Sequence, residues 1–190
     1  MKIGIDISQI AYRTGVSNYL ESLVKHLISL DKENEYILFF SSMRRNFQFS
    51  IFNFQSMPQN LKIKTFKIPP SLLDIIWNRL HILPIENFVG DVDIFITSDW
   101  TEPPAKKAKK ATIIYDLIVY KYPEEAHAKT EFSLKNLILS PNIVDIQKRK
   151  LKWVAKESDL IFTISDSSKK DIVDILNIDS NKIKVLYPGF

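Results

Sequence analysis

Short apolar runs alternate with longer amphipathic segments along the whole chain. Residues 35–41 (EYILFFS) and 160–165 (LIFTIS) are largely apolar, which is typical of strands whose two faces are both buried. Residues 15–30 (GVSNYLESLVKHLISL) instead place apolar side chains three and four positions apart, and this spacing predicts a helix with one buried face. Strand and helix signals follow each other repeatedly, so we expect an α/β protein.

The alternation extends over the entire sequence. It predicts strands over residues 2–7, 35–41, 61–68, 92–98, 111–116, 160–165 and 182–188. It predicts helices over residues 15–30, 71–83 and 165–176, and one or two more within 121–158, a short one near 123–130 and a long one that ends near residue 158. Residues 44–60 lack a clear period, and we interpret them as a loop with room for one short edge strand.

These elements predict a single Rossmann-like domain that spans residues 1–190. About seven strands separated by helices favour a mostly parallel sheet with helices on both faces. In open parallel sheets, ligands bind outside the carboxyl ends of the strands. The residues that come at the end of each strand are therefore the first candidates for a functional site.

The composition agrees with a globular domain and narrows the chemistry. The chain has 190 residues, of which 45% are apolar and 25% are charged, and it contains no cysteine. Disulfides, thiolate metal sites and thiol nucleophiles are thereby excluded, which is compatible with the cytoplasm. The N-terminus (MKIGIDIS) has the pattern of a strand rather than of a signal peptide, and no apolar run approaches the ~20 residues that span a bilayer. We expect a cytoplasmic location.

Four lysines form the notable charge cluster of a chain whose net charge is only +4. Lys106, Lys107, Lys109 and Lys110 lie together just before the strand at 111–116. Such a cluster attracts phosphate, nucleic acid or anionic lipid, and the alternative is a solvated loop. No aromatic residues are interleaved with the lysines, as they would be in a groove for single-stranded nucleic acid. We therefore expect no nucleic-acid partner and consider peripheral contact with the inner face of a membrane through these lysines.

Arg13, Thr14 and Gly15 connect the first strand to the first helix. A lone glycine at this place is neither the GxGxxG of a dinucleotide site nor the GxxxxGKS of a phosphate loop. The N-terminus of a helix nevertheless presents free N–H groups and a positive dipole end, which suit an anion. The alternative is a tight turn in which Gly15 supplies an unusual backbone angle. The residues themselves leave both interpretations open.

Polar residues also end three later strands. Ser98 and Asp99 come at the end of the strand at 92–98, Asp116 ends the next strand, and Ser165 ends the strand after that. Asp116 lies between apolar residues on both sides, so it is either a binding or catalytic group or a capping residue that turns the chain. Ser165 begins SDSS before an amphipathic run, the pattern of a helix N-cap.

Three other motifs carry less weight. Asp91 and Asp93 spell D-x-D, a metal signature in some sugar transferases, but they precede a strand and so belong to the opposite edge of the sheet. His26, His81 and His127 lack the paired spacing of a metal site, and no GxSxG elbow of a serine hydrolase occurs. We therefore expect neither a metal nor another cofactor.

Four segments, in this order and at these separations, resemble the N-terminal domain of family 4 (group 1) glycosyltransferases. They are RTGVSNYLESLVKHL (13–27), TIIYDLIVYKYPEE (112–125), TISDSSKKDI (163–172) and KIKVLYPGF (182–190). These enzymes are retaining glycosyltransferases of the GT-B type, in which two Rossmann-like domains face each other across a cleft. The resemblance runs essentially from Met1 to Phe190 and names no particular sugar.

The resemblance implies roles for the residues at the strand ends. The family pattern is a strand, then His-Asp-Leu, then a Tyr-Pro pair, and here Asp116, Leu117, Tyr122 and Pro123 match it. The histidine position is Tyr115, which can donate a hydrogen bond but carries no charge near neutral pH. Asp116 and Tyr115 are the catalytic residues that the resemblance implies. The substrate-binding residues that we expect are Arg13, Thr14, Gly15, Ser98, Asp99 and Ser165.

The resemblance also implies a second domain. In this family the nucleotide-sugar donor is held mainly by the C-terminal domain, with its Glu-x7-Glu motif, and this chain ends at the Pro-Gly turn that leads into that domain. We therefore expect the acceptor-side half of an enzyme that moves a sugar to a glycan or lipid-linked acceptor, inactive by itself. The alternative from another class is a non-catalytic nucleotide- or sugar-binding module.

Overall fold

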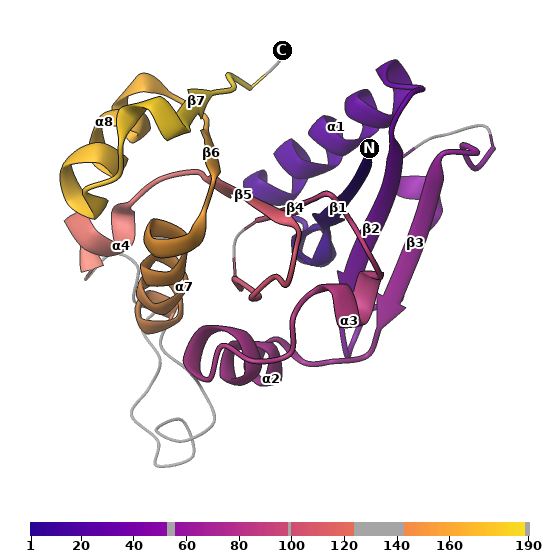
Figure 1. Ribbon diagram of the computed structural model, residues 1–190, viewed down its shortest axis with the longest axis horizontal. Helices are drawn as coiled ribbons and strands as arrows, with labels where there is room; N and C mark the ends of the chain where they lie inside the picture. Colours follow the sequence, from indigo (N-terminus) through magenta and orange to yellow (C-terminus); the bar gives the residue numbers. More distant parts are fainter. Residues whose placement is uncertain (53–55, 99, 124–142, 189–190) are drawn as a thin grey trace.

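A computed structural model of the protein describes residues 1–52, 56–98, 100–123 and 143–188. In this part of the chain seven strands form one parallel sheet in the order β3-β2-β1-β4-β5-β6-β7, which confirms the predicted fold class (Figure 1). The strands are β1 (Lys2–Asp6), β2 (Glu35–Ser41), β3 (Leu61–Phe66), β4 (Ile94–Thr97), β5 (Lys109–Ile114), β6 (Leu160–Thr163) and β7 (Ile183–Val185).

The strand order reverses its direction between β1 and β4. The chain runs from β1 through β2 to β3 toward one edge of the sheet, and from β4 through β5 and β6 to β7 toward the other. At the reversal β1 and β4 lie side by side, with Ile3 opposite Ile94 and Ile5 opposite Ile96. Such a reversal leaves a crevice at the carboxyl ends of the two strands, and ligands of open α/β sheets bind there.

Helix α1 (Gly15–Leu30) covers one face of the sheet. Its apolar positions Leu20, Val24 and Ile28 are buried against side chains of β1 and β2, as the three- and four-residue spacing predicts. The short 3-10 helices η1 (Ser8–Tyr12) and η2 (Phe49–Phe52) extend the same apolar cluster. On this face, η1 connects the end of β1 to the beginning of α1. The candidate site begins at this connection.

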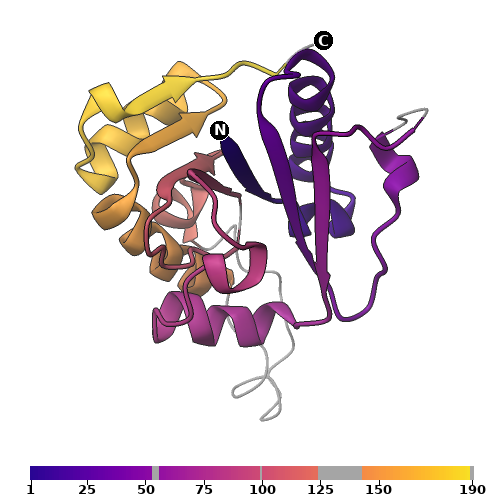
Figure 2. The ribbon, with the colours of Figure 1, turned by 45° about the vertical axis from the view of Figure 1, so that its right-hand side comes forward.

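The opposite face is covered by helices from two parts of the chain (Figures 1 and 2). Trp77 and Val89 pack on Phe39 and Phe95 of the central strands. The helices on β5, β6 and β7 bury Leu151, Val154 and Ile172. These elements are α2 (Pro70–Leu73), the π-helix η3 (Asp74–Arg79), α3 (Glu86–Val89), α7 (Ile143–Glu157) and α8 (Asp166–Leu176). The chain is completed by α4 (Ile118–Lys121) and η4 (Ser180–Lys182).

Two of the predicted elements differ from the structure. The helix expected over 71–83 divides into α2 and the π-helix η3, in which Leu80 N–H donates to the carbonyl of Ile75. In residues 44–60 the described part holds η2 and no strand. The short helix expected near 123–130 falls almost entirely outside the described residues. The long helix that follows ends at Glu157, within one residue of the expectation.

Candidate functional site at the carboxyl edge of the sheet

The parallel sheet brings the candidate residues to one edge. β1, β4, β5 and β6 are neighbours in the sheet, and all of them point the same way. Their carboxyl ends lead directly into η1, Ser98, Tyr115 with Asp116, and Ser165. Residues that are far apart in the sequence therefore meet along a single rim, as the sequence analysis expects. Asp99 lies outside the described residues.

Thr14 and Ser17 close the N-terminus of α1 in a capping box. Thr14 Oγ1 accepts the Ser17 N–H at 3.4 Å, and the Thr14 N–H donates to Ser17 Oγ at 3.1 Å. Ser17 Oγ also donates to the carbonyl oxygen of Gln9 at 2.7 Å, which ties the helix to η1. The N–H groups of Gly15 and Val16, in the first turn of α1, have no acceptor within the helix. These contacts fix the N-terminus of α1 and leave two backbone N–H donors without an intrahelical partner.

Arg13, and not Gly15, carries the unusual backbone angle at this connection. Arg13 has φ 55° and ψ 43°, the left-handed region that only glycine and a few polar residues adopt readily. Gly15 is the first residue of α1, and a Cβ built on it meets no atom within 4 Å. The interpretation of Gly15 as the residue that supplies an unusual angle is therefore wrong. What its missing side chain provides is open space beside the helix end.

Tyr115 and Ser98 form a buried hydroxyl pair below the rim. Their hydroxyl oxygens are 3.3 Å apart, and the exposed fractions of the two residues are 7% and 3%. The ring of Tyr19 from α1 meets the Tyr115 ring edge-on, with centroids 5.6 Å apart. These contacts fix the end of β5 against the end of β4, so Tyr115 supports the rim from below rather than projecting from it.

Asp116 is the exposed member of the rim. Its Oδ1 accepts the N–H of Ile118 at 3.0 Å, which turns the chain into α4. A single lone pair on one oxygen satisfies this cap, and the rest of the carboxylate faces solvent. Both alternatives raised for this residue are compatible with the geometry, because capping leaves Oδ2 available to a ligand.

Ser165 has the capping role that its sequence predicts. Its Oγ accepts the N–H of Ser168 at 3.1 Å and begins α8. Ser168 Oγ in turn donates to the carbonyl oxygen of Tyr115 at 2.9 Å. The loop after β6 is thereby joined to the end of β5, next to Asp116.

Asp6 is a rim residue that the sequence analysis missed. It ends β1, is 8% exposed, and accepts the N–H of Ser8 at 2.8 Å. Burial raises the pKa of Asp6 above its ordinary value, although the hydrogen bonds from Ser8 and the charge of Lys150 oppose the increase. The signal was present in the sequence, since Asp6 interrupts the apolar run KIGIDI as Asp116 interrupts its own.

Gln9 and Trp100 face the same crevice as Asp6. Together with Ser98 and Thr101 they line a cavity of about 20 Å³ between the ends of β1 and β4. Gln9 Oε1 and Trp100 Nε1 are buried and have no hydrogen-bond partner among the residues that the structure describes. One is an acceptor and the other a donor, and the cavity has room for a single water molecule with which they would pair. Nothing in the local sequence marks these two residues.

A buried polar network lies beneath the crevice, between β4 and β5. Glu102 is fully buried, and its Oε2 accepts from Thr97 Oγ1 at 2.6 Å. The Glu102 N–H donates to Asn78 Oδ1 at 2.9 Å. Lys110 Nζ lies 3.0 Å from Glu102 Oε1 and 2.9 Å from Glu157 Oε2. A pair of opposite charges therefore stabilises the loop that follows β4 from inside.

This network corrects the assignment of Lys110 to a membrane contact. Lys110 is a residue of β5 with an exposed fraction of 5%, and its ammonium group is paired with two carboxylates. The sequence analysis places Lys110 in a loop, but the strand β5 already begins at Lys109. Because Lys110 is buried in this strand, it cannot reach a lipid surface. Lys106, Lys107 and Lys109 are exposed, but they lie at the amino edge of the sheet, opposite the candidate site.

Acidic residues surround the exposed lysines. Glu86 Oε1 accepts the backbone N–H groups of Lys106, Lys107 and Ala108. The depression at this edge is lined by Lys2, Lys107 and Lys109 together with Glu33, Glu35, Glu86, Asp91 and Asp93. Asp93 also accepts the Lys2 N–H at 2.7 Å, which agrees with a turn role for the D-x-D segment. The mixed charge gives no strong positive field toward an anionic membrane.

The described residues hold no group of three or more histidine, aspartate and glutamate side chains arranged to bind a metal ion. Within the same residues, no helix combines the length and the apolar character that crossing a membrane requires.

The fold is shared with a plant protein of known structure. The chain aligns over 100% of its length with Phytolacca americana apo UGT2, at 13% sequence identity and a TM-score of 0.51. It aligns equally completely with Phytolacca americana UGT2 complexed with UDP-2fluoro-glucose and pterostilbene, at 11% identity and a TM-score of 0.50. No family model and no curated protein matches the sequence.

The chain spans about half the length of these structures, 52% and 54% respectively. At such low identity the similarity establishes the fold alone. The shared fold is a Rossmann-like α/β fold, and the similarity does not single out family 4.

Proposed function

We propose that this chain is the acceptor-side half of a retaining glycosyltransferase that moves a sugar from a nucleotide-sugar donor to a hydroxyl of a glycan or lipid-linked acceptor. The observation that supports the proposal most is that the N-terminus of α1 and the exposed carboxylate of Asp116 meet at the carboxyl edge of the sheet, where Val16 and Asp116 line one cavity of about 170 Å³. UGT2, which shares this fold, was solved with a UDP-sugar analogue and a second organic molecule bound.

The reaction needs two kinds of help from the protein. Transfer from a nucleoside diphosphate builds positive charge on the anomeric carbon and negative charge on the departing phosphate. The N–H groups of Gly15 and Val16, at the positive end of the α1 dipole, are suited to the leaving diphosphate. The open space beside Gly15 lets a phosphate oxygen approach the backbone closely.

The acceptor hydroxyl needs a group that orients it and receives its proton. Asp116 has an exposed carboxylate oxygen that its capping bond leaves available. Tyr115 and Ser98 hold the end of β5 from below and so act as positioning residues. Retention of configuration then follows from attack on the same face that the leaving group departs from, with no carboxylate nucleophile required. The donor would be held mainly by a second domain.

A lipid-linked acceptor has to approach the carboxyl edge of the sheet, while Lys106, Lys107 and Lys109 lie at the amino edge. The proposal therefore includes no membrane contact through these lysines. It does include a cytoplasmic location, because nucleotide sugars and a cysteine-free chain both fit that compartment.

Replacement of Asp116 by asparagine in the complete enzyme tests the proposal. Asparagine keeps the oxygen that caps Ile118, so folding is preserved while the charge is lost. We expect turnover to fall by about 100-fold or more, as for the loss of a group that receives a proton in the transition state. The measurement is initial rate across a panel of nucleotide sugars, with thermal unfolding as the check on folding. Unchanged turnover would leave Asp116 with the capping role only.

The same panel separates the enzyme from a non-catalytic binding module. A module would bind a nucleotide or a sugar and release it unchanged, whereas the enzyme consumes the donor and forms a glycoside. Donor consumption is followed by release of the nucleoside diphosphate in the presence and absence of acceptor.

A further inference from the structure

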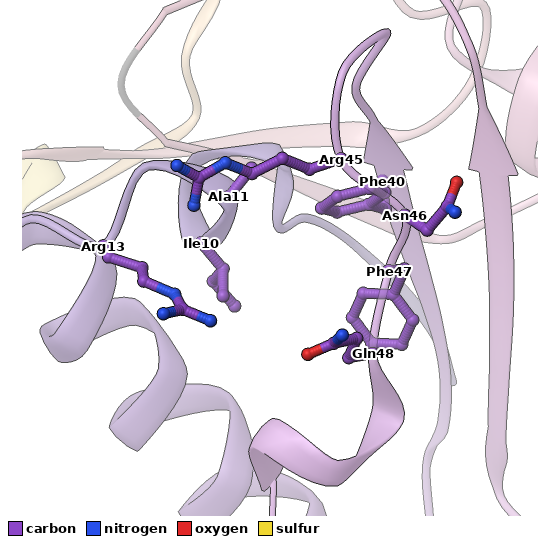
Figure 3. Close-up of a pocket in the computed structure, with 8 residues that line it drawn as sticks. All are labelled: Ile10, Ala11, Arg13, Phe40, Arg45, Asn46, Phe47 and Gln48. Carbon is purple, nitrogen blue, oxygen red and sulfur yellow. The ribbon is translucent and has the colours of Figure 1, made fainter.

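A second cavity lies beside the crevice, on the side of β2. It has a volume of about 290 Å³ and is enclosed by η1, the end of β2 and the loop that follows β2. Figure 3 shows Arg13 and Arg45 with both guanidinium groups on the η1 side of the cavity, opposite Phe47 and Gln48. The residues that line it are Ile10, Ala11, Arg13, Phe40, Arg45, Asn46, Phe47 and Gln48. The sequence analysis singles out Arg13 but none of the others.

The segments that build this cavity contain no carboxylate. No aspartate or glutamate occurs between Ile7 and Leu20, or between Tyr36 and Leu73. Among the described residues, neither Arg13 nor Arg45 forms an ion pair. Two permanent positive charges therefore share one cavity without compensation, although like charges repel each other. A bound anion would relieve this repulsion.

Arg13 occupies a backbone position that disfavours it. In the left-handed region arginine is less stable than glycine or asparagine, because its Cβ crowds the following carbonyl group. Packing does not explain its presence, since the residue is exposed. The same backbone conformation places the guanidinium at the cavity rather than away from it (Figure 3). Backbone strain at an exposed cation points to a role for the cation.

The walls of the cavity suit a small polar molecule with an apolar ring face. Phe40 and Phe47 pack with ring centroids 5.3 Å apart and exclude water from one side. The side-chain amides of Asn46 and Gln48 are exposed and offer both donors and acceptors. A volume of about 290 Å³ is at the lower end of the range for ligand pockets. It fits a monosaccharide or polyol rather than a long glycan or an acyl chain.

We propose that this cavity binds the phosphate group of a phosphorylated sugar or polyol. The phosphorylated molecule is either the whole acceptor or the acidic part of a larger acceptor. Two guanidinium groups match the two negative charges of a phosphate monoester, and each can bind two of its oxygens. Arg13 lies two residues before Gly15, so a ligand held here lies next to the N-terminus of α1. The assignment of the ligand as acceptor rests on the proposed function; the phosphate site itself does not.

Titration of chain 1–190 with glucose 6-phosphate, inorganic phosphate and glucose, followed by NMR of backbone amides, tests the site. We expect glucose 6-phosphate to shift the amides of residues 10–13 and 45–48, inorganic phosphate to shift the same amides, and glucose to shift none. Arg13→Asn and Arg45→Gln should each weaken the binding of glucose 6-phosphate by about 10- to 100-fold. Arg44→Gln is the matched control, because Arg44 has the same charge and is exposed but does not line the cavity.

Arg13→Asn also distinguishes binding from folding. Asparagine tolerates the left-handed region, so the thermal midpoint of this variant should be no lower than that of the original chain while its phosphate affinity falls. Equal weakening by Arg44→Gln would reduce the effect to general surface charge and overturn the proposal. Binding of glucose as tight as that of glucose 6-phosphate would overturn it as well.

These binding measurements require no sugar transfer, so their outcome is independent of the Asp116 test. Suppose that the enzyme transfers sugar to neutral and to phosphorylated acceptors, and that Arg13→Asn changes neither rate. The phosphate site is then wrong, and the proposed function stands. If Arg13 and Arg45 bind phosphate while no transfer occurs with any donor, the site stands and the assignment of its ligand as an acceptor is wrong.

Discussion

Gly4 of β1 leaves room for the side chain of Phe95 in β4. It lies opposite Phe95 in the register of β1 and β4. A Cβ added at Gly4 would be 2.6 Å from Phe95 Cδ2 and 3.5 Å from Val92 Cγ1. Phe95 is 1% exposed and also packs within the core on that face, so it has little room to move. The absence of a side chain at Gly4 therefore leaves the space that the Phe95 ring occupies.

We predict that Gly4→Ala lowers the free energy of unfolding by about 1–3 kcal/mol, the usual cost of overpacking a core. Urea unfolding followed by fluorescence of the tryptophans measures it. Gly15→Ala is the matched control, because a Cβ there meets nothing within 4 Å and the free energy of unfolding should change little. Equal stability of the Gly4→Ala variant and the original chain would show that Phe95 can move aside.

The sequence reveals a polar residue of the candidate site when that residue interrupts an apolar strand. It gives little indication of the other polar residues that lie at the site or in the core. Asp116 stands out against its neighbours, and Asp6 carries the same signal at the end of β1. Lys110 was misassigned because its partners, Glu102 and Glu157, are distant in the sequence and become neighbours only through the pairing of β5 with β4 and β6. Charged side chains are usually exposed, so a sequence analysis expects them at the surface. This expectation is wrong for a lysine that is buried in an ion pair.

At the scale of elements, η3 and α7 are joined by a group of charged and aromatic contacts. Asp74 of η3 accepts hydrogen bonds from Arg149 of α7 at 2.9 Å and from Arg79 at 3.0 Å. Trp153 Nε1 donates to the carbonyl oxygen of Asn78 at 2.8 Å, and the Trp153 ring stacks on His81 with centroids 3.6 Å apart. The sheet brings the two helices together, and these contacts fix them.

The acids of this joint make its stability depend on pH. Burial by itself would raise the pKa of Asp74, but hydrogen bonds from Arg149, Arg79 and Asn78 outweigh it and hold the pKa below its ordinary value of 3.8. For Glu157, burial is likewise outweighed by Lys110 and His81, and its pKa lies below 4.5. Groups with lowered pKa contribute stability above their unfolded pKa and lose it as the pH falls. The contribution is therefore complete above pH 4.5 and declines below it.

We predict that the free energy of unfolding decreases as the pH is lowered from about 6 to 3, and that Asp74→Asn reduces this dependence. At pH 7 the variant should be less stable by about 1–3 kcal/mol, because two guanidinium groups lose the negative charge and one of the two oxygens that they bind. Urea unfolding at a series of pH values measures both effects. Asp91→Asn is the control, since exposed Asp91 forms no ion pair with the described residues. An identical pH profile for Asp74→Asn and the original chain would contradict the assignment.

The same elements show where sequence patterns predict structure and where they do not. Strand β2 is buried on both faces, β6 alternates between buried and half-buried residues, and α1 has one buried stripe, so hydrophobic spacing locates them directly. The π-helix η3 was not predicted, because the spacing of apolar residues over 71–83 fits an α-helix equally well. Its contacts with α7, such as the hydrogen bond from Arg149 to Asp74, join residues 75 positions apart and leave no local signal in the sequence.

At the scale of the whole molecule, the candidate site is a property of topology. The rim residues come from four separate strand ends, and the cavity with Arg13 and Arg45 adds a fifth place, after β2. Strand order alone makes them neighbours, which is why the sequence predicts the edge on which they meet. It does not predict the depth at which each side chain lies: Ser98 and Tyr115 are buried, whereas Asp116 is exposed.

The proposed division of labour between this chain and a second domain gives the last prediction. Each face of the sheet is covered by helices of the chain itself, so residues 1–190 should unfold in a single cooperative transition. If the donor is held by another domain, the isolated chain should bind a phosphorylated sugar yet transfer sugar at least about 10³-fold more slowly than the complete enzyme, because the donor is no longer held beside the acceptor. Calorimetry and release of nucleoside diphosphate measure the two properties on the same preparation. Comparable transfer by chain 1–190 alone would place the donor site within these residues, with the N–H groups of Gly15 and Val16 as the first place to look for it.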